Sequence, residues 1–498
     1  MNIAQHVERN AGRLGSDPAI LFEGRSVSYA TLDYCASALG DSLVRHGVRP
    51  GDRVALYLPN IPAFVLAYLA GLKVGAIVVS INSIFKSEEV HYIVNDAQPK
   101  VLFTTAELLP NVPRPDCPSL AHTVLCEGVE PDAAMLEDWL ARGDPAFRAA
   151  RMRPDDPAVL LYSSGTTGFP KGVTLTHENI VTNMRTAAKC SGYRPGDRLA
   201  LFLPLFHVFG QNYIMNGGLE AGATLSLFRR FVPDAVLPAI GRDRITKFFA
   251  VPTIYIALLN ADLARHDLSS IDYYFSAAAT MPEEISRKWT ERFGLRVYEG
   301  YGLTECSPFA CYNHLTEHRF GSVGTAVEGF TLAIHDEADR EVARGEWGEI
   351  VIRGPGVMKG YWGKPDDTEQ ALRNGWLHSG DIGRMDRDGY VYIVDRVKDM
   401  VNVSGFKVWP AEVEHVLYRH AAVREVAVYG TPDPLKGEQV RAAVVLKAGQ
   451  LASVEELAQF CRDHLASYKT PARVDLVQEL PKSATGKILK RVLRDQAA

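Results

Sequence analysis

The sequence predicts an α/β protein with a large N-terminal domain of layered, mostly parallel sheets and a small α+β C-terminal domain. A chain of 498 residues is too long for one hydrophobic core, since domains hold roughly 150 residues each. Short apolar runs alternate with helical stretches through most of the chain, which is typical of parallel sheets covered by helices. The C-terminal part contains its own strands and helices, enough for a separate domain.

The elements can be assigned in chain order from their hydrophobic periodicity. In the large domain a helix is predicted at residues 62–74, with strands at 53–58, 76–81, 100–104, 158–162, 199–203, 224–228 and 390–394. In the small domain the predicted elements are helices at 411–419 and 454–464 and strands at 423–429 and 442–446. The charged run 395–399 separates the two sets, so we place the domains at 1–395 and 396–498.

Composition excludes several classes of protein. The net charge of −5 at pH 7 argues against a nucleic-acid binder. Seven cysteines with no CxxC pair argue against a disulfide scaffold or a zinc ribbon, and they favour a reducing compartment. The first residues lack a signal pattern, and no window holds about 18 uncharged apolar residues. We therefore expect a cytoplasmic protein without a transmembrane segment.

A loop rich in glycine and hydroxyl groups directly follows the predicted strand at 158–162. Glycine lets backbone N–H groups approach phosphate oxygens closely, the hydroxyls add donors, and a lysine adds positive charge. The pattern is not a Walker A loop, because Pro170 and Gly172 flank Lys171 where that motif has Gly and Ser or Thr. The predicted polyphosphate-binding residues are Ser163, Ser164, Gly165, Thr166, Thr167, Gly168 and Lys171.

This loop resembles the phosphate-binding loop of the adenylate-forming superfamily, which includes acyl-CoA synthetases, firefly luciferases and peptide-synthetase adenylation domains. Further segments resemble the signature segments of that family, in the same order along the chain. They are residues 203–210 beside the acyl pocket, 301–305 for adenine and magnesium, 379–381 for ribose, 395–399 at the hinge and 481–487 with a catalytic lysine. Residues 299–308 look most like those of bacterial fatty-acid–CoA ligases, which favours an aliphatic acid over an aryl acid.

The resemblance implies that a carboxylate attacks the α-phosphate of ATP and that a thiol, coenzyme A, then takes the acyl group. Two anions meet in the first step, so the site must neutralise charge. Mg²⁺ is expected on hard oxygen ligands from Ser163 and Glu305. The implied catalytic residues are Lys487, His207, Thr304 and Lys171. The implied ATP site adds to the loop Ala278, Ala279, Glu299, Gly300, Tyr301, Gly302, Thr304, Asp381, Arg396 and Lys487.

The acyl pocket is expected beside residues 275–282, a segment in which relatives often carry two glycines. Ala277 and Ala278 stand there in this chain, and each adds a methyl group to the wall. We therefore expect a narrow pocket that favours short, medium or slender unsaturated chains. The candidate walls are His207, Phe209, Gln211, Phe249, Val251, Ala277, Ala278 and Gly302, with ordinary core packing as the alternative for the aromatic residues.

The boundary between the domains contains the expected hinge. The resemblance implies that the small domain rotates at Lys398 between the two half-reactions. The rotation would withdraw Lys487 and bring toward the thiol substrate Ser404, Gly405, Phe406 and Lys407. Phe406 stands where the family often has a second glycine.

We therefore predict an ATP-dependent acyl-CoA synthetase whose substrates are a small carboxylic acid and coenzyme A. The alternatives are an acyl-AMP ligase that loads a separate acyl carrier protein, an aryl-acid–CoA ligase, and a non-catalytic acyl- or nucleotide-binding homologue. A homodimer is left open. Against a non-catalytic homologue stands the joint retention of Lys171, Thr304, Glu305, Asp381, Arg396 and Lys487.

Overall fold

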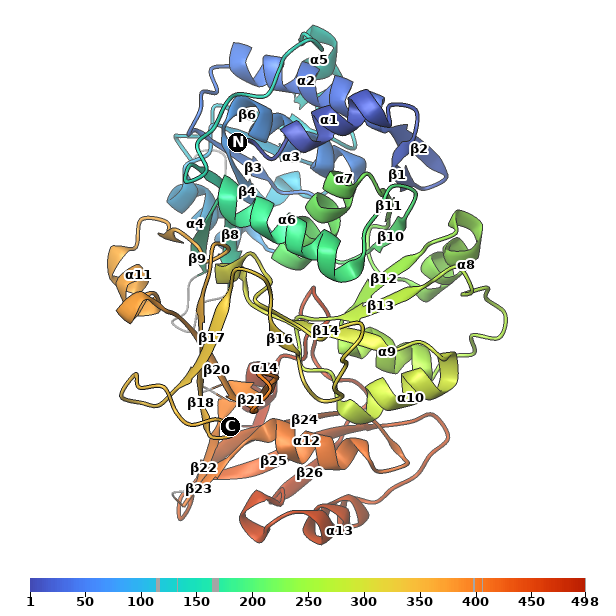
Figure 1. Ribbon diagram of the computed structural model, residues 1–498, viewed down its shortest axis with the longest axis vertical. Helices are drawn as coiled ribbons and strands as arrows, with labels where there is room; N and C mark the ends of the chain where they lie inside the picture. Colours follow the sequence, from blue (N-terminus) through green and yellow to red (C-terminus); the bar gives the residue numbers. More distant parts are fainter. Residues whose placement is uncertain (113–116, 132, 164–169, 397–398, 405, 498) are drawn as a thin grey trace.

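The computed structural model describes residues 1–112, 117–131, 133–163, 170–396, 399–404 and 406–497. Figure 1 shows four β-sheets with their helices, the last of them formed by the C-terminal part of the chain. No described helix combines the length and the apolar character that a membrane crossing requires.

The first sheet has eight strands in the order β19-β9-β8-β4-β3-β5-β6-β7. The strands from β8 to β7 are parallel, whereas β9 and β19 join antiparallel at one edge. The strands are β3 (Arg53–Leu56), β4 (Ile77–Ser80), β5 (Val101–Thr104), β6 (His122–Leu125), β7 (Ala134–Met135), β8 (Pro157–Ser163), β9 (Lys171–Thr176) and β19 (Gly360–Tyr361). The accompanying helices are α2 (Tyr29–Arg45), α3 (Pro62–Val74), α4 (Ser87–Ala97), α5 (Leu136–Arg142), α11 (Pro365–Ala371) and the 3₁₀ turn η1 (Leu109–Asn111).

The second sheet has nine strands in the order β16-β15-β14-β13-β12-β10-β11-β1-β2. Its centre, from β14 to β1, is parallel, and antiparallel strands close both edges. The strands are β1 (Pro18–Phe22), β2 (Arg25–Ser28), β10 (Arg198–Leu201), β11 (Thr224–Leu227), β12 (Lys247–Ala250), β13 (Tyr273–Ser276), β14 (Val297–Tyr301), β15 (Cys311–Tyr312) and β16 (Thr325–Ala326). The accompanying helices are α1 (Gln5–Arg13), α6 (His177–Ser191), the π-helix η3 (Phe209–Asn216), α7 (Gly217–Ala221), α8 (Pro233–Asp243), α9 (Pro252–Leu259), α10 (Glu283–Phe293) and the 3₁₀ turn η4 (Thr304–Cys306).

The third sheet is antiparallel and has the order β17-β18-β20-β21. Its strands are β17 (Thr331–His335), β18 (Trp347–Arg353), β20 (Leu377–Met385) and β21 (Val391–Arg396), with the 3₁₀ turn η5 (Arg373–Gly375) before β20. The fourth sheet contains β22 (Val401–Val403), β23 (Phe406–Val408), β24 (Val423–Asp433), β25 (Gly437–Leu446) and β26 (Arg473–Leu476). Its helices are α12 (Pro410–Tyr418), α13 (Val454–His464), α14 (Lys490–Ala497) and the 3₁₀ turn η7 (Ser467–Lys469).

Helix α3 shows how the sequence sets one of these elements. Pro62 fits the first turn, where a missing N–H costs nothing, and Gly75 ends the helix in the left-handed region at φ 83°. The sequence of this helix is apolar on nearly every face, and its residues are accordingly buried from Phe64 onward. The buried amine of its one lysine, Lys73, is paired with the carboxylate of Glu8 at 2.6 Å.

The predicted α/β architecture is confirmed, and every helix and strand expected from the sequence is present within a few residues of its predicted ends. The expectation of mostly parallel strands describes the first two sheets. The third sheet differs, because all its pairings are antiparallel. This antiparallel sheet carries the segment 379–381 and leads directly into the run 395–399.

Candidate active site

The predicted site residues come from separate elements that meet between the three sheets of the large domain and the C-terminal part (Figure 1). They lie at the end of β8, at the start of β9, at the end of β14, within β20 and before η3. The loop 482–488, closed by a bridge between Lys482 and Ile488, reaches this region from the C-terminal part.

Hard oxygen atoms gather where β8 ends. The Oγ of Ser163 donates to Oε1 of Glu305 at 3.3 Å, and the hydroxyl of Tyr361 donates to the same oxygen at 3.0 Å. Burial, and then the charge of Glu305, raises the pKa of Tyr361, so the phenol stays protonated and remains a donor. A carboxylate and a hydroxyl this close fit the oxygen ligands that Mg²⁺ requires.

Lys171 stands directly across from Ser163, because the two residues are antiparallel partners in β8 and β9. The hairpin therefore fixes both ends of the predicted phosphate loop. The loop itself, with Ser164, Gly165, Thr166, Thr167 and Gly168, lies outside the described residues. The amine of Lys171 contacts Asp367 of α11 at 2.5 Å and lies 5.2 Å from the ring centre of Tyr361.

The end of β14 is closely packed around its glycines. A Cβ on Gly302 would lie 1.6 Å from the carbonyl oxygen of Pro308, and one on Gly300 would lie 2.1 Å from the ring of Phe309. Only glycine can therefore stand at these two positions without moving the backbone or the rings. Thr304 begins the turn η4 directly after this segment and is half-buried.

Glu299 lies within β14, and its side chain is buried, unlike that of a solvent-exposed acid. Burial, and then the nearby Glu283, raises its pKa well above the usual range for a carboxyl group. Its Oε1 has no hydrogen-bond partner among the described residues. Burial therefore disfavours the charged form of this carboxyl group.

The predicted ribose carboxylate is held by a neighbouring phenol. Tyr301 donates its hydroxyl to Oδ2 of Asp381 at 2.8 Å, and both side chains are buried. The backbone of Arg396 is the cross-strand partner of Asp381. The side chain of Arg396 lies outside the described part of the chain.

His207 precedes η3 and lies within electrostatic range of the lysine of the C-terminal loop. Its Nδ1 accepts the backbone N–H of Phe209 at 3.3 Å, so the proton of the neutral ring is on Nε2. Burial, followed by the positive charge of Lys487, lowers the pKa of His207 to about 4. The structure thus brings His207 and Lys487, separated by 280 positions in the sequence, into electrostatic contact.

The C-terminal loop is docked on the large domain by a backbone contact. The hydroxyl of Thr253 in α9 donates to the carbonyl of Gly486 at 3.0 Å. The loop is shaped internally by Ser483, whose Oγ accepts the backbone N–H of Lys487 at 3.2 Å and whose N–H donates to its carbonyl at 2.8 Å. Gly486 adopts φ 81°, which a side chain would disfavour.

The predicted acyl-pocket residues are divided between the site and the core. Val251 and Ala277 are both buried, and Val251 lies beside the docked loop, since a Cβ on Gly486 would touch it at 3.0 Å. Ala278 adopts φ 69°, an unusual conformation for any residue with a Cβ, and Ala279 follows it half-buried.

Three other predicted walls take part in core packing. Phe209 and Phe249 pack edge-on or tilted against Phe275 and Tyr213 in an aromatic cluster. The amide of Gln211 donates to Ser80 at 2.7 Å and to the carbonyl of Leu205 at 2.9 Å, so it is held inside the fold.

The predicted thiol-side segment points elsewhere. Lys398 and Gly405 lie outside the described residues, and Ser404 adopts φ 51°. Phe406 is 58% exposed and stacks on Tyr468 with ring centres 4.9 Å apart. Lys407 forms an exposed ion pair with Glu337 at 3.0 Å.

Sequence reasoning missed three residues at the site. Thr253, Tyr361 and Asp367 contact predicted site residues, but each comes from an element outside the recognised segments. Tyr361 and Asp367 lie almost 200 positions beyond Lys171, which both contact. The pairing of β19 with β9 brings Tyr361 to this place, and no local sequence pattern indicated it.

Comparison with known proteins identifies the relatives of this chain. A model described as AMP-binding enzyme matches residues 7–362, and a model described as AMP-binding enzyme C-terminal domain matches residues 412–487. A long-chain-fatty-acid–CoA ligase from Bacillus subtilis (strain 168) is 37% identical over 520 residues, covering 98% of this chain and 93% of the relative. A feruloyl-CoA synthase from Amycolatopsis sp is 36% identical over 480 residues, covering 96% and 95%.

Solved structures show the same likeness. The crystal structure of an anthranilate CoA ligase in complex with anthranoyl-AMP superimposes with a TM-score of 0.95 at 32% identity, covering 100% of this chain and 97% of that one. A benzoate CoA ligase from Burkholderia xenovorans LB400 superimposes with a TM-score of 0.90 at 29% identity, covering 99% and 100%.

Proposed function

Since the chain belongs to the AMP-binding enzyme family and is an acid–thiol ligase of the acyl-CoA synthetase kind, we propose that its acid is aliphatic. The reaction is carboxylic acid + ATP + coenzyme A to acyl-CoA + AMP + diphosphate, through an acyl-adenylate. The observation that supports the adenylation step most directly is the Ser163–Glu305 pair at the end of β8. The Asp381 carboxylate, held by Tyr301, and Lys487, on the loop docked at Thr253, add to it.

Each group has a role that follows from its chemistry. Ser163 and Glu305 would hold Mg²⁺, which neutralises phosphate charge when bound. Lys487 brings a positive charge on a flexible stem to the point where carboxylate and phosphate meet. His207, neutral because of burial and Lys487, adds no third charge there and can donate through Nε2. Asp381 accepts hydrogen bonds from ribose hydroxyls.

Lys171 is paired with a carboxylate that a phosphate would have to displace. Its amine contacts Asp367 at 2.5 Å, and 15% of the Lys171 side chain and 35% of the Asp367 side chain are exposed. A triphosphate carries more charge than one carboxylate and would displace Asp367 from this contact. Lys171 then supports the phosphates from the β9 side of the loop.

The aliphatic preference rests on the relatives and on the wall of the predicted pocket. The relatives named long-chain-fatty-acid–CoA ligase reach 37% identity, although a feruloyl-CoA synthase reaches 36%. An aryl-acid–CoA ligase is therefore the second candidate. Ala277 is buried and Ala278 is half-buried directly after β13. We infer that their methyl groups shorten the space for the acid.

An acid series tests the substrate class. Pyrophosphate release from ATP would be measured with straight-chain acids of increasing length and with benzoate- and cinnamate-type acids. We expect a maximum of kcat/KM at short or medium straight chains, and Ala277→Gly with Ala278→Gly should move it to longer acids. One methylene in an apolar pocket discriminates by about 1–3 kcal/mol. An optimum on aryl acids, or one that the double variant leaves in place, contradicts the narrow aliphatic pocket.

The acceptor is tested by measuring thioester formation with the same acids. We expect thioester formation with coenzyme A but none with a phosphopantetheinylated acyl carrier protein. Thioester formation on the carrier protein alone would support the acyl-AMP ligase instead. We further infer that the C-terminal domain begins at residue 396 and turns at Lys398 to bring Ser404 through Lys407 to the thiol.

A further inference from the structure

Strand β20 carries the predicted ribose carboxylate on an irregular segment. Val351 pairs with His378 and Glu349 pairs with Ile382, so a single residue of β18 faces three consecutive residues of β20. A bulge of this kind leaves backbone groups without their regular partners across the ladder. Buried backbone N–H groups need acceptors, and something else must supply them here.

Two side chains supply the missing acceptors. The backbone N–H of Gly380 donates to Oε1 of Glu349 at 2.9 Å. The N–H of Asp381 donates to Oγ of Ser379 at 3.1 Å, and this hydroxyl donates to the carbonyl of Ile350 at 2.5 Å. Gly380 adopts φ 70°, a backbone conformation that favours glycine. The bulge therefore depends on this glycine as well as on the two side-chain contacts.

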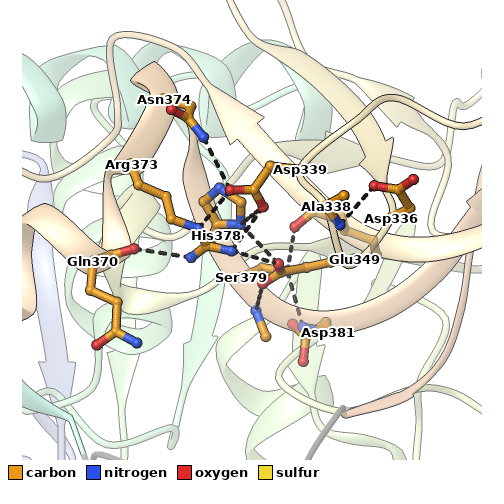
Figure 2. A network of polar contacts seen from close by, with 12 residues as sticks. Asp336, Ala338, Asp339, Glu349, Gln370, Arg373, Asn374, His378, Ser379 and Asp381 are labelled. Carbon is orange, nitrogen blue, oxygen red and sulfur yellow. Dashed lines mark hydrogen bonds and ion pairs between the residues drawn. The ribbon is translucent and has the colours of Figure 1, made fainter.

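The carboxylate of Glu349 is itself fixed from its other side. Its Oε2 accepts from Nδ1 of His378 at 2.8 Å, and the guanidinium of Arg373 lies 3.5 Å away. Arg373 is held by two hydrogen bonds to Asp339, at 2.9 and 3.1 Å. Figure 2 shows these side chains meeting around Glu349, with Ser379 and Asp381 beyond it.

We propose that Glu349 is a positioning residue for nucleotide recognition. Oriented by His378 and Arg373, its carboxylate fixes the backbone of Gly380 and so aims Asp381 at the ribose hydroxyls. The inference rests on the proposed function, in which ATP is bound through Asp381. Glu349 and His378 thus contribute specifically to ribose binding, in addition to any contribution to folding.

The test compares ATP with 2′,3′-dideoxy-ATP in acid-dependent pyrophosphate release at saturating acid. The ratio of kcat/KM for the two nucleotides measures what the ribose hydroxyls contribute. Glu349→Gln should lower this ratio by about tenfold, since a charged acceptor that orients a hydrogen-bonding group is lost. The KM for the acid should stay the same. Asp381→Asn should lower the ratio at least as far.

Matched variants separate positioning from folding. In His378→Asn the amide N–H can take the place of the Nδ1 proton, so we expect the ratio to stay within about twofold of the unaltered enzyme. His378→Leu removes the donor and should lower the ratio. Glu346→Gln, an exposed acid three positions before Glu349, should leave it unchanged.

Different outcomes would contradict the positioning role of Glu349 and the proposed function. Equal losses with ATP and dideoxy-ATP in Glu349→Gln and His378→Leu would mean that the residues support only the fold, and would overturn the positioning role. A ratio that Asp381→Asn leaves unchanged would overturn it too, by removing the ribose contact. Absence of acid-dependent pyrophosphate release in the unaltered enzyme would contradict the proposed function itself. If Glu349→Gln does not fold, the two His378 variants decide.

Discussion

Two loops of the C-terminal part lie in very different environments. The loop that carries Lys487 is docked on the large domain, where Thr253 holds the Gly486 carbonyl and the charge of Lys487 helps to lower the pKa of half-buried His207. The loop between β22 and β23 leads to Phe406, which is exposed, and to Lys407, which makes a surface ion pair with Glu337. The difference indicates that this arrangement of the chain suits adenylation. The thiol step would need the second loop to replace the first.

The largest effect should come from the docked lysine. Lys487→Ala should lower acyl-adenylate formation by about 10²–10³, as expected when one electrostatic contact with a developing charge is lost. Thioester formation from supplied acyl-AMP should change little, because no phosphate charge develops in that step. Stopped-flow measurement of each half-reaction separates the two rates. Equal losses in both would contradict the assignment of this loop to the first step.

A smaller effect should follow when the docking contact alone is removed. Thr253→Val keeps the shape of the side chain but loses the hydrogen bond to Gly486, worth about 0.5–1.5 kcal/mol. We expect adenylation to slow by about two- to tenfold while the thioester step is unchanged. Thr253→Ser retains the hydroxyl and is the matched control. If Ser and Val behave alike, the hydroxyl does not hold the loop.

The smallest effect should come from the exposed contact. Glu337→Gln breaks the ion pair with Lys407, whose partners are 92% and 57% exposed. Pairs of this kind contribute little and are screened by salt. We expect both half-reactions to change by less than about twofold. A strong loss of adenylation would show that the second loop also stabilises the docked arrangement, and would narrow the contrast between the loops.

Much of the fold could be predicted because periodicity is local. Helix α13 has its predicted bounds, since Ser453 caps its first turn and the apolar spacing is regular. Strand β24 was predicted to end at residue 429, and Gly430 and Pro432 follow there. It continues to Asp433, where pairing with Gly437 of β25 extends the hairpin. Pairing between strands overrode the local preference in this case.

The site was predictable only where its residues lie in a recognised segment. Glu305 and Asp381 were predicted in this way. Thr253 and Asp367 were not predicted, because threonine and aspartate occur near the start of many helices without any role in a functional site. Their roles become visible only when the chain brings α9 to Gly486 and α11 to Lys171. The raised pKa of Glu299 could not be predicted either, since it depends on burial.

The left-handed backbone of Ala278 has a consequence for how substrate range can evolve. A residue with a Cβ costs about 1–2 kcal/mol in this conformation, and glycine relieves that cost. If the methyl group also narrows the pocket, mutation to glycine widens substrate range and strengthens the fold together. The reverse change loses stability as it gains selectivity. Lineages that keep alanine here would then be held by selection on the acid, and drift alone would lead toward broader enzymes.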